Sequence, residues 1–293
     1  MSVSTVELSA RAGNPGLVLS AAVLWGTTGV AMTYAAAQPV SVAAARIVIG
    51  GLLLALAYGG GLRELSPYWG WLVAGAGCVA VYQVAYFAAV SRTGVATGTV
   101  VTIGSGPVFA GLIGYLVTRA RPGRRWLVAT AGAVVGCAVL VGGGTRTGVE
   151  PVGVLLALVS GLGYAAYATI AGHLIGRGAD HRAVVAGLFG GAGILLMPVL
   201  VWSGTAWLLT GRGFAVAAYL GVVTTALGYL WYGRGLRTTP VAVATTLTLA
   251  EPAVAALLGF TLLHERPTVP AAVGLAILAA SLLLLLPTRG RSG

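Results

Sequence analysis

The sequence contains no lysine, one aspartate and three histidines, and charged residues make up only 8% of its 293 positions. So few charges exclude a water-soluble domain of this size. The HExxH motif, paired aspartates and Gly-x-Ser-x-Gly are all missing, so zinc, aspartyl or serine-type catalysis lacks its residues. A Walker A motif is missing too, and ATP hydrolysis would need another subunit. We therefore expect a protein that is not an enzyme and that uses no metal and no cofactor.

The two cysteines, Cys78 and Cys137, both lie inside apolar runs, which favours small core residues over a disulfide or a metal pair. The formal charge of +11 comes from arginine alone. In a soluble protein this balance would indicate nucleic acid as a partner. Here most arginines lie at the ends of apolar runs, where a membrane explains them, so we expect no nucleic-acid partner.

Apolar residues make up 58% of the chain, and the mean hydropathy is +0.94. They come in runs of about 18 to 25 residues between short Gly, Pro and Arg breaks, as transmembrane helices do. The alternating segments of about ten residues that build a membrane barrel are missing. The sequence therefore predicts an all-α polytopic membrane protein. Its ten expected transmembrane helices cover residues 16–36, 40–59, 68–90, 95–118, 126–143, 151–175, 183–203, 214–235, 240–263 and 269–286.

The distribution of arginine predicts how these helices are oriented. With the N-terminus in the cytoplasm, twelve of the 17 arginines fall on the inner side and four on the outer side, and Arg46 falls within the second span. This excess fits the positive-inside rule, so both termini are expected to be cytoplasmic. The expected location is the inner (plasma) membrane, crossed several times.

The two halves of the chain resemble each other when the second is shifted by 145 residues, which places Pro107 over Pro252. With a slightly different offset, Trp25 meets Tyr164. Five spans per half is an odd number, so the second copy is expected to insert upside down relative to the first. Inverted five-helix repeats are typical of transporters, in which two half-folds exchange inward-open and outward-open shapes around a midplane site.

This repeat divides the chain into five expected parts. They are a cytoplasmic lead at 1–15, a first five-helix repeat at 16–143, a linker at 144–150, a second five-helix repeat at 151–286 and a cytoplasmic tail at 287–293. The lead lacks the basic start, apolar core and cleavage site of a removable signal peptide.

Several short motifs occur in an order that resembles a known family. They are LWG at 24–26, Arg46 in AAARIVIGG, and EPAVAALLG…HE at 251–265. Together they resemble the drug/metabolite transporter superfamily, and within it the EamA-type ten-helix proteins, over essentially the whole chain. The resemblance implies efflux of small metabolites such as amino acids, or of drug-like compounds, through a cavity between the halves. Ala120 stands where members often carry an acid, although the second-half counterpart Glu265 is present, so only one half can use that acid.

The stretch from Pro240 to Pro267 is the expected working part of the chain. Glu251 and Pro252 lie near the middle of about 23 apolar, small or hydroxyl-bearing residues, a length that crosses a bilayer. A carboxylate at this depth is costly unless it is neutral or faces a partner or a wet cavity. Pro252 crowds the carbonyl of Thr248, which then needs another partner. We expect Glu251 to bind a cationic group of the substrate or to exchange a proton; the alternative is that it only locks helices together.

Helical spacing and depth select the other candidates, which share aromatic or amide side chains well inside their spans. The set suits flat or amphipathic molecules held by stacking, cation–π contacts and a few hydrogen bonds, although ordinary helix packing would also use such residues. The expected substrate-binding residues are Trp25, Tyr82, Gln83, Tyr86, Tyr164, Tyr167, Thr248 and Glu251, with Pro107 and Pro252 as hinges.

Two further charged or titratable residues lie inside the spans. Arg46 is about two turns from the end of its helix, which favours snorkelling to the surface or a structural contact over substrate binding. With only this cation deep in the spans, anionic substrates such as phosphosugars are expected to be disfavoured. His173 lies near the inner end of the sixth span, where it is either an interface residue or a proton relay, so it joins Glu251 as a candidate for proton coupling.

These observations favour a secondary transporter that exports small metabolites by alternating access. Proton-coupled antiport and uncoupled facilitated diffusion both remain open, and a membrane-embedded enzyme, a channel and a sensor are less well supported. The expected partners are a small-molecule substrate, membrane lipids and, for antiport, protons. The glycines allow close packing within a monomer and leave a weak dimer open.

Overall fold

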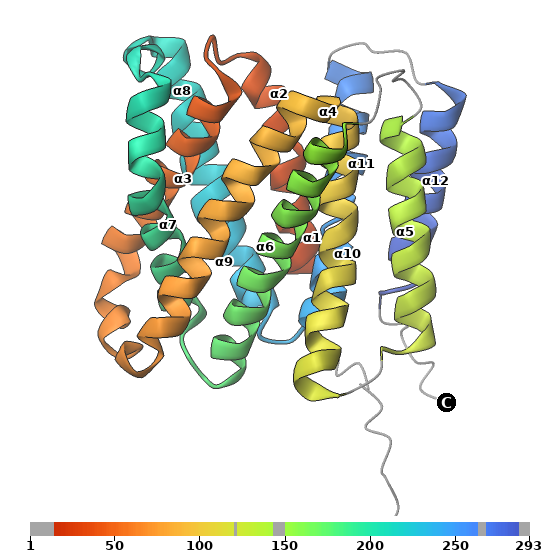
Figure 1. Cartoon of the computed structure of the whole chain (residues 1–293), viewed down its shortest axis with the longest axis horizontal. Coiled ribbons are helices and arrows are strands. Elements are labelled where there is room, and N and C mark those ends of the chain that lie inside the picture. Colours follow the sequence, from red (N-terminus) through yellow and green to blue (C-terminus); the bar gives the residue numbers. More distant parts are fainter. Residues whose placement is uncertain (1–14, 120–121, 143–149, 263–267, 287–293) are drawn as a thin grey trace, which may run out of the picture.

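The computed structural model describes residues 15–119, 122–142, 150–262 and 268–286, and all regular elements in these ranges are helices (Figure 1). The residues before 15, most of the linker, the tail at 287–293, Ala120 and Glu265 lie outside the described residues. The elements are α1 (Pro15–Gly26), α2 (Thr28–Thr33), α3 (Pro39–Tyr58), η1 (Gly59–Arg63), η2 (Ser66–Tyr68), α4 (Trp69–Thr118), α5 (Arg124–Gly142), α6 (Pro151–Gly176), α7 (His181–Ser203), η3 (Ala206–Leu209), α8 (Gly211–Ala218), η4 (Tyr219–Leu227), α9 (Gly228–Gly235), α10 (Val241–Leu247), α11 (Ala250–Leu262) and α12 (Val269–Leu283).

Eight stretches of the described residues are long and apolar enough to cross a membrane. One of them, Pro39–Gly94, is 56 residues long and holds two of the predicted spans, 40–59 and 68–90. The apolar helix α12, at 15 residues, is shorter than a full span. The predicted all-helical, multi-pass class is therefore confirmed, whereas the count of ten spans stays a prediction.

The boundary between the predicted spans 68–90 and 95–118 differs from the expectation. No loop separates them, because α4 is helical from Trp69 to Thr118 except at Gly94, whose φ of 81° and ψ of 160° are not helical. The ribbon of α4 turns back on itself at this point (Figure 1). A positive φ costs glycine little because it has no Cβ, so one glycine is enough to reverse the chain.

Three other predicted spans are also interrupted, and the first of them, 16–36, is divided into α1 and α2 at Thr27. Residues 214–235 contain nine residues of π-helix, η4, between α8 and α9. The predicted helix 240–263 is divided into α10 and α11 at residues Thr248 and Leu249. Irregular backbone inside a membrane helix is tolerated where it lies within the protein or lines a cavity, and π-helical turns occur often at functional sites.

The helices pack in pairs that join the two halves of the chain. Helix α3 packs on α7, α5 packs on α12, α4 packs on α6, and α1 packs on α9 and α11. The α3–α7 pair lies at one edge of the molecule and the α5–α12 pair at the opposite edge (Figure 1). The two halves are therefore interleaved, and the helices between the edges surround the centre.

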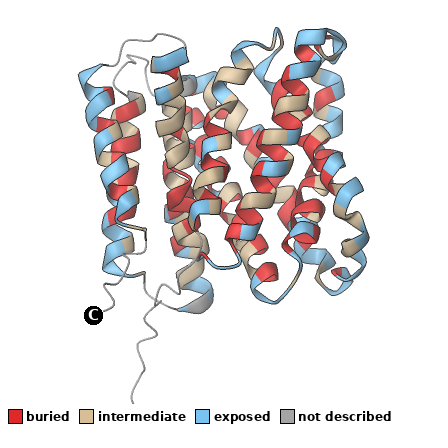
Figure 2. Ribbon diagram, turned by 180° about the vertical axis from the view of Figure 1, so that it is seen from behind, coloured by how far each residue is buried: buried red, intermediate tan, exposed pale blue. Residues whose placement is uncertain are grey.

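Buried residues lie on the helix faces that meet, and exposed residues lie along the outward sides (Figure 2). Many exposed side chains are large and apolar, among them Ile194 at 76% and Trp202 at 91% exposure. A water-soluble protein avoids such surfaces, whereas lipid tails cover them in a bilayer.

One exposed ion pair joins α4 to the start of α6. A guanidinium nitrogen of Arg92 donates to a carboxylate oxygen of Glu150 at 2.7 Å, and the two side chains are 49% and 39% exposed. Exposed pairs contribute at most about 1 kcal/mol, because solvent screens the charges. We expect Glu150→Gln to shift the midpoint of thermal unfolding in detergent by no more than about 2 °C. A shift several times larger than that of Arg63→Gln, which removes an exposed charge elsewhere, would contradict this expectation.

Candidate functional site

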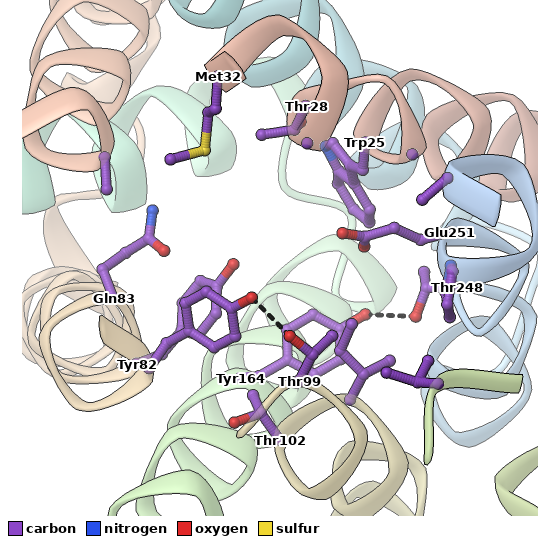
Figure 3. Close-up of a pocket in the computed structure, with 18 of the residues that line it drawn as sticks. Trp25, Thr28, Met32, Tyr82, Gln83, Thr99, Thr102, Tyr164, Thr248 and Glu251 are labelled. Carbon is purple, nitrogen blue, oxygen red and sulfur yellow. Dashed lines mark hydrogen bonds between the residues drawn. The ribbon is translucent and has the colours of Figure 1, made fainter. Parts of the chain in front are cut away.

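A cavity of about 510 Å³ lies between the helices of the two halves. Residues of α1, α2, α3, α4 and α5 from the first half line it, together with residues of α6, α9 and α11 and the α10–α11 break from the second. Most of the wall is apolar or aromatic, with a few polar groups among them (Figure 3). Small-molecule sites have this size and this mixture.

The break between α10 and α11 places Glu251 on the cavity wall. The backbone N–H of Glu251 donates to the carbonyl of Thr248 at 2.9 Å. The carbonyl that was predicted to need another partner is therefore satisfied by a backbone N–H three residues later in the chain. Glu251 and Pro252 lie in the first turn of α11. A proline there costs little because the first N–H groups of a helix have no internal partner. The positive end of the helix dipole also favours a carboxylate at this position.

The carboxylate of Glu251 points into the cavity beside Trp25 (Figure 3). It makes no hydrogen bond or ion pair with any residue that the structure describes. The carboxylate is therefore available to bind a ligand in the cavity, since it does not bond to any described residue of a neighbouring helix.

Hydrogen bonds hold several polar wall residues in place. The hydroxyl groups of Tyr164 and Thr248 lie 2.9 Å apart, and those of Tyr86 and Thr99 lie 2.8 Å apart (Figure 3). The indole N–H of Trp25 donates to the backbone carbonyl of Thr224, in the π-helical segment η4, at 2.9 Å. The bond of Trp25 joins the two halves of the chain, whereas the Tyr164–Thr248 bond lies within the second half and the Tyr86–Thr99 bond within the first.

Aromatic rings form much of the remaining wall. The ring centroids of Trp25 and Tyr229 are 4.7 Å apart, and those of Tyr82 and Tyr164 are 6.0 Å apart. Both distances lie in the range of favourable aromatic pairs. The rings are therefore held by one another and present fixed apolar surfaces to the cavity.

Seven of the eight predicted substrate-binding residues line this single cavity. They are Trp25, Tyr82, Gln83, Tyr86, Tyr164, Thr248 and Glu251. Tyr167 is the exception: it is 1% exposed and lies behind the wall, with its ring centroid 5.4 Å from that of Tyr164 and 5.8 Å from that of Phe189.

The remaining candidates are placed apart. Pro252 lines the cavity beside the helix break, whereas Pro107 is buried inside α4, which stays helical around it. His173 lies in the last turn of α6, away from the cavity wall, with its ring centroid 5.5 Å from that of Trp71.

The structure places Arg46 on the cavity wall, whereas the sequence analysis favoured a side chain that reaches the membrane surface or makes a structural contact. The expected snorkelling toward the surface does not occur: Arg46 lines the cavity, and its Nε is buried with no hydrogen-bond partner among the described residues. Its face of α3 also carries Ala43, another wall residue one turn earlier. Depth along the helix gave the wrong reading here because it says nothing about which face points inward.

Sequence reasoning also missed several wall residues that carry weak signals. Some follow from helical spacing, since Thr28, Gly29 and Met32 lie on the same side as Trp25. Others are apolar and look like ordinary packing residues in the sequence. The additional wall residues include Thr28, Gly29, Met32, Phe87, Thr102, Leu140, Val141 and Tyr229.

Helices that cross a membrane several times around a central cavity with an apolar and aromatic wall and a few polar groups are typical of membrane transport proteins. The model of the EamA-like transporter family matches residues 16–142 and again 151–286. The chain therefore belongs to the EamA-like transporter family, within the drug/metabolite transporter superfamily.

Two curated relatives and one solved structure resemble the chain over nearly its full length. The uncharacterized transporter YwfM of Bacillus subtilis is 36% identical over 272 residues, with 92% of each chain covered. The uncharacterized inner membrane transporter YicL of Salmonella typhimurium is 27% identical over 289 residues, covering 94% of this chain and 96% of its own. A protein of known crystal structure shares the fold with a TM-score of 0.78 at 21% identity, covering 92% of this chain and 95% of its own.

Removing the hydroxyl of Tyr164 tests how the broken helix is supported. Tyr164→Phe keeps the ring and loses the hydrogen bond to Thr248 at the end of α10. A neutral hydrogen bond contributes about 1 kcal/mol, so we expect the midpoint of thermal unfolding to fall by about 2 °C. Tyr34→Phe, which removes an exposed hydroxyl from outside the cavity, is the matched control. Equal midpoints for both variants would show that this bond does not support the break.

Proposed function

We propose that the protein is a secondary transporter that exports small amphipathic or cationic metabolites, amino acids or drug-like compounds through the central cavity. The observation that carries the proposal is Glu251, which lies at the break of a membrane helix and faces an aromatic-walled cavity, with no hydrogen-bond or ion-pair partner for its carboxylate in the part of the chain that the structure describes. Broken helices whose ends face a midplane cavity are a recurring way to bind substrate in secondary transporters.

Alternating access by two inverted five-helix repeats is the proposed mechanism. The packing pairs support it, because α3 and α7, and likewise α5 and α12, stand at matching places in the two predicted repeats. The pairing of α4 with α6 likewise mirrors the pairing of α1 with α9 and α11. The family model matches two segments of similar length, as an internal repeat requires. Pro252, beside the helix break, and its counterpart Pro107 are the proposed hinges.

A single label tests the inverted arrangement. In a variant without Cys78 and Cys137, we place a cysteine at Glu150, which is exposed at the start of α6. A membrane-impermeant maleimide added to intact cells is expected to label it, because both termini are proposed to be cytoplasmic. Labelling only after the cells are opened would show that the first half does not end outside the cell. The proposed inverted repeat would then be wrong.

Proton coupling is proposed to use Glu251, because a carboxyl group that faces a cavity can release its proton when a cation binds. His173, at the end of α6, could take part only as a relay away from the cavity. The alternative is uncoupled facilitated diffusion. The proposed location is the inner (plasma) membrane, in contact with lipid, as a monomer or weak dimer.

Reconstitution separates these possibilities. Purified protein in proteoliposomes is screened against a metabolite mixture, and proton flux is measured for every compound that moves. Transport with proton flux supports antiport, and transport without it supports facilitated diffusion. If no compound in a broad screen crosses faster than in empty vesicles, the proposed function is wrong.

A further inference from the structure

The central cavity lies toward one end of the helix bundle. Its wall takes the last residues of α1 and α5, early residues of α3, and residues of α4 on both sides of Gly94. All of these belong to the end where α4 reverses (Figure 1), which we call the Gly94 end. The opposite end, where α1, α5 and α10 begin, is called the Trp126 end.

Buried side chains fill the space between the cavity and the Trp126 end. Tyr167 and Tyr232 lie one turn beyond the wall residues Tyr164 and Tyr229 on their helices, and both are buried. The ring centroid of Tyr232 is 5.5 Å from that of Trp25. These rings therefore block the path from the cavity to the Trp126 end.

A small hydrogen-bonded network joins α5 to α10 at the Trp126 end. The indole N–H of Trp126 donates to the carbonyl of Ala242 at 3.0 Å, and the hydroxyl of Thr246 donates to the same carbonyl at 2.9 Å. Because the Thr246 hydroxyl has used its hydrogen, the hydroxyl of Thr130 is the donor across the 3.0 Å that separates the two. Both threonines are buried. The Trp126 ring also packs on Gly111 of α4, where a Cβ would overlap it.

The other predicted repeat lacks this network. The offset of 145 residues pairs each of its three side chains with an apolar one: Ala271, Leu275 and Val101 stand at the positions of Trp126, Thr130 and Thr246. None of the three has a polar side-chain atom, so the same bonds have no means of forming when the Gly94 end closes. Two states that are related by an inverted repeat are therefore unequal in energy.

We propose that Trp126 and Thr130 form a latch with α10 that holds the cavity closed toward the Trp126 end when no substrate is bound. The inference rests on the proposed function, since a latch has a role only in a protein that alternates between two states. Opening the Trp126 end separates α10 from α5 and breaks both of its bonds. The resting protein therefore favours the state in which the cavity faces the Gly94 end.

A cysteine beneath the cavity reports the opening. Ala244 is buried on α10, one turn before Thr248 on the same face, so it lies just beyond the wall toward the Trp126 end. Ala244→Cys is made in a variant without Cys78 and Cys137. Its reaction rate with a membrane-impermeant maleimide is measured in right-side-out and inside-out vesicles without substrate. The label at Glu150, whose side chain pairs with Arg92 beside Gly94, identifies the face of the Gly94 end.

Trp126→Phe combined with Thr130→Val removes both bonds of the latch and keeps an aromatic ring on Gly111. The carbonyl of Ala242 still accepts from Thr246, so the fold is expected to persist. The latched protein is expected to react slowly from both faces. The double variant is expected to react about tenfold faster from the face of the Trp126 end alone, since two neutral hydrogen bonds no longer oppose opening.

The matched control is Trp69→Phe combined with Thr261→Val. Trp69 is exposed, and the hydroxyl of Thr261 is exposed and donates within its own helix, so the rate is expected to stay unchanged. Each variant must elute as a single symmetric peak. Where the double variant does not fold, Thr130→Val alone decides the question, with an expected rise of about three- to fivefold.

Three outcomes overturn the latch: an unchanged rate in the latch variants, an equal rise from both faces, or fast reaction of the latched protein from the face of the Trp126 end. Failure of the proposed function is seen separately. The reporter would then respond as expected, yet no compound would cross the membrane in proteoliposomes.

Discussion

Glu251→Gln is expected to leave the fold intact and to reduce transport of a cationic or doubly charged compound at least about tenfold. The substitution preserves the shape of the side chain and removes its negative charge. Because this carboxylate faces the cavity and makes no hydrogen bond or ion pair with the described residues, no structural bond is lost with it. What is lost is a charge-assisted contact to the ligand, which contributes about 1.5–3 kcal/mol.

The measurement is initial-rate transport in proteoliposomes over a range of pH, using a compound found in the screen. Glu150→Gln is the matched control, because it makes the same substitution in an exposed residue outside the cavity. If antiport is correct, Glu251→Gln also loses the pH dependence of the wild type, since the group that exchanges the proton is gone. A fully active variant with unchanged pH dependence would reduce Glu251 to a scaffold residue.

The class of fold could be predicted from the sequence because apolar length is a direct physical requirement of crossing a bilayer. The details of the backbone could not. Gly94 was expected in a loop between two spans and instead reverses α4 by itself. The π-helical segment η4 has no signal in hydropathy, because its residues are as apolar as those of a regular helix. Its effect is visible only in three dimensions, where the carbonyl of Thr224 accepts the indole N–H of Trp25.

The polar part of the site was predictable for a related reason. Polar and aromatic groups deep in a membrane need partners or a cavity, so Glu251, Gln83 and Tyr164 stand out against an apolar background. Arg46 stood out as well, but its length allows it to reach the surface from the same depth, and the sequence alone does not choose between the two directions. Leu140 and Val141 line the cavity without any such signal, since apolar wall and apolar core look alike in a sequence.

Gly51 is a position where a substitution is expected to affect the scaffold strongly. At this point α3 packs directly on α7, and a Cβ on Gly51 would overlap the carbonyl oxygen of Phe189 and lie 2.8 Å from its carbonyl carbon and 3.2 Å from the nitrogen of Gly190. These are backbone atoms of α7 on the face that packs against α3, and they cannot move aside as a flexible side chain can. The offset that places Trp25 over Tyr164 also places Gly51 over Gly190, so equivalent points of the two predicted repeats meet here.

Gly51→Ala is therefore expected to destabilise the protein by about 1–3 kcal/mol or more, because the two helices must separate to admit one methyl group. The readouts are the yield of protein that elutes as a single symmetric peak and the midpoint of thermal unfolding. Gly190→Ala is the matched control, since its Cβ would lie 3.3 Å from the Cβ of Ala55 and 3.5 Å from the oxygen of Gly51, where small shifts suffice. Gly77→Ala, with no atom within 4 Å of the added Cβ, is expected to be neutral. If Gly51→Ala is no less stable than these two, α3 and α7 do not meet backbone to backbone, and the two halves must join in another way.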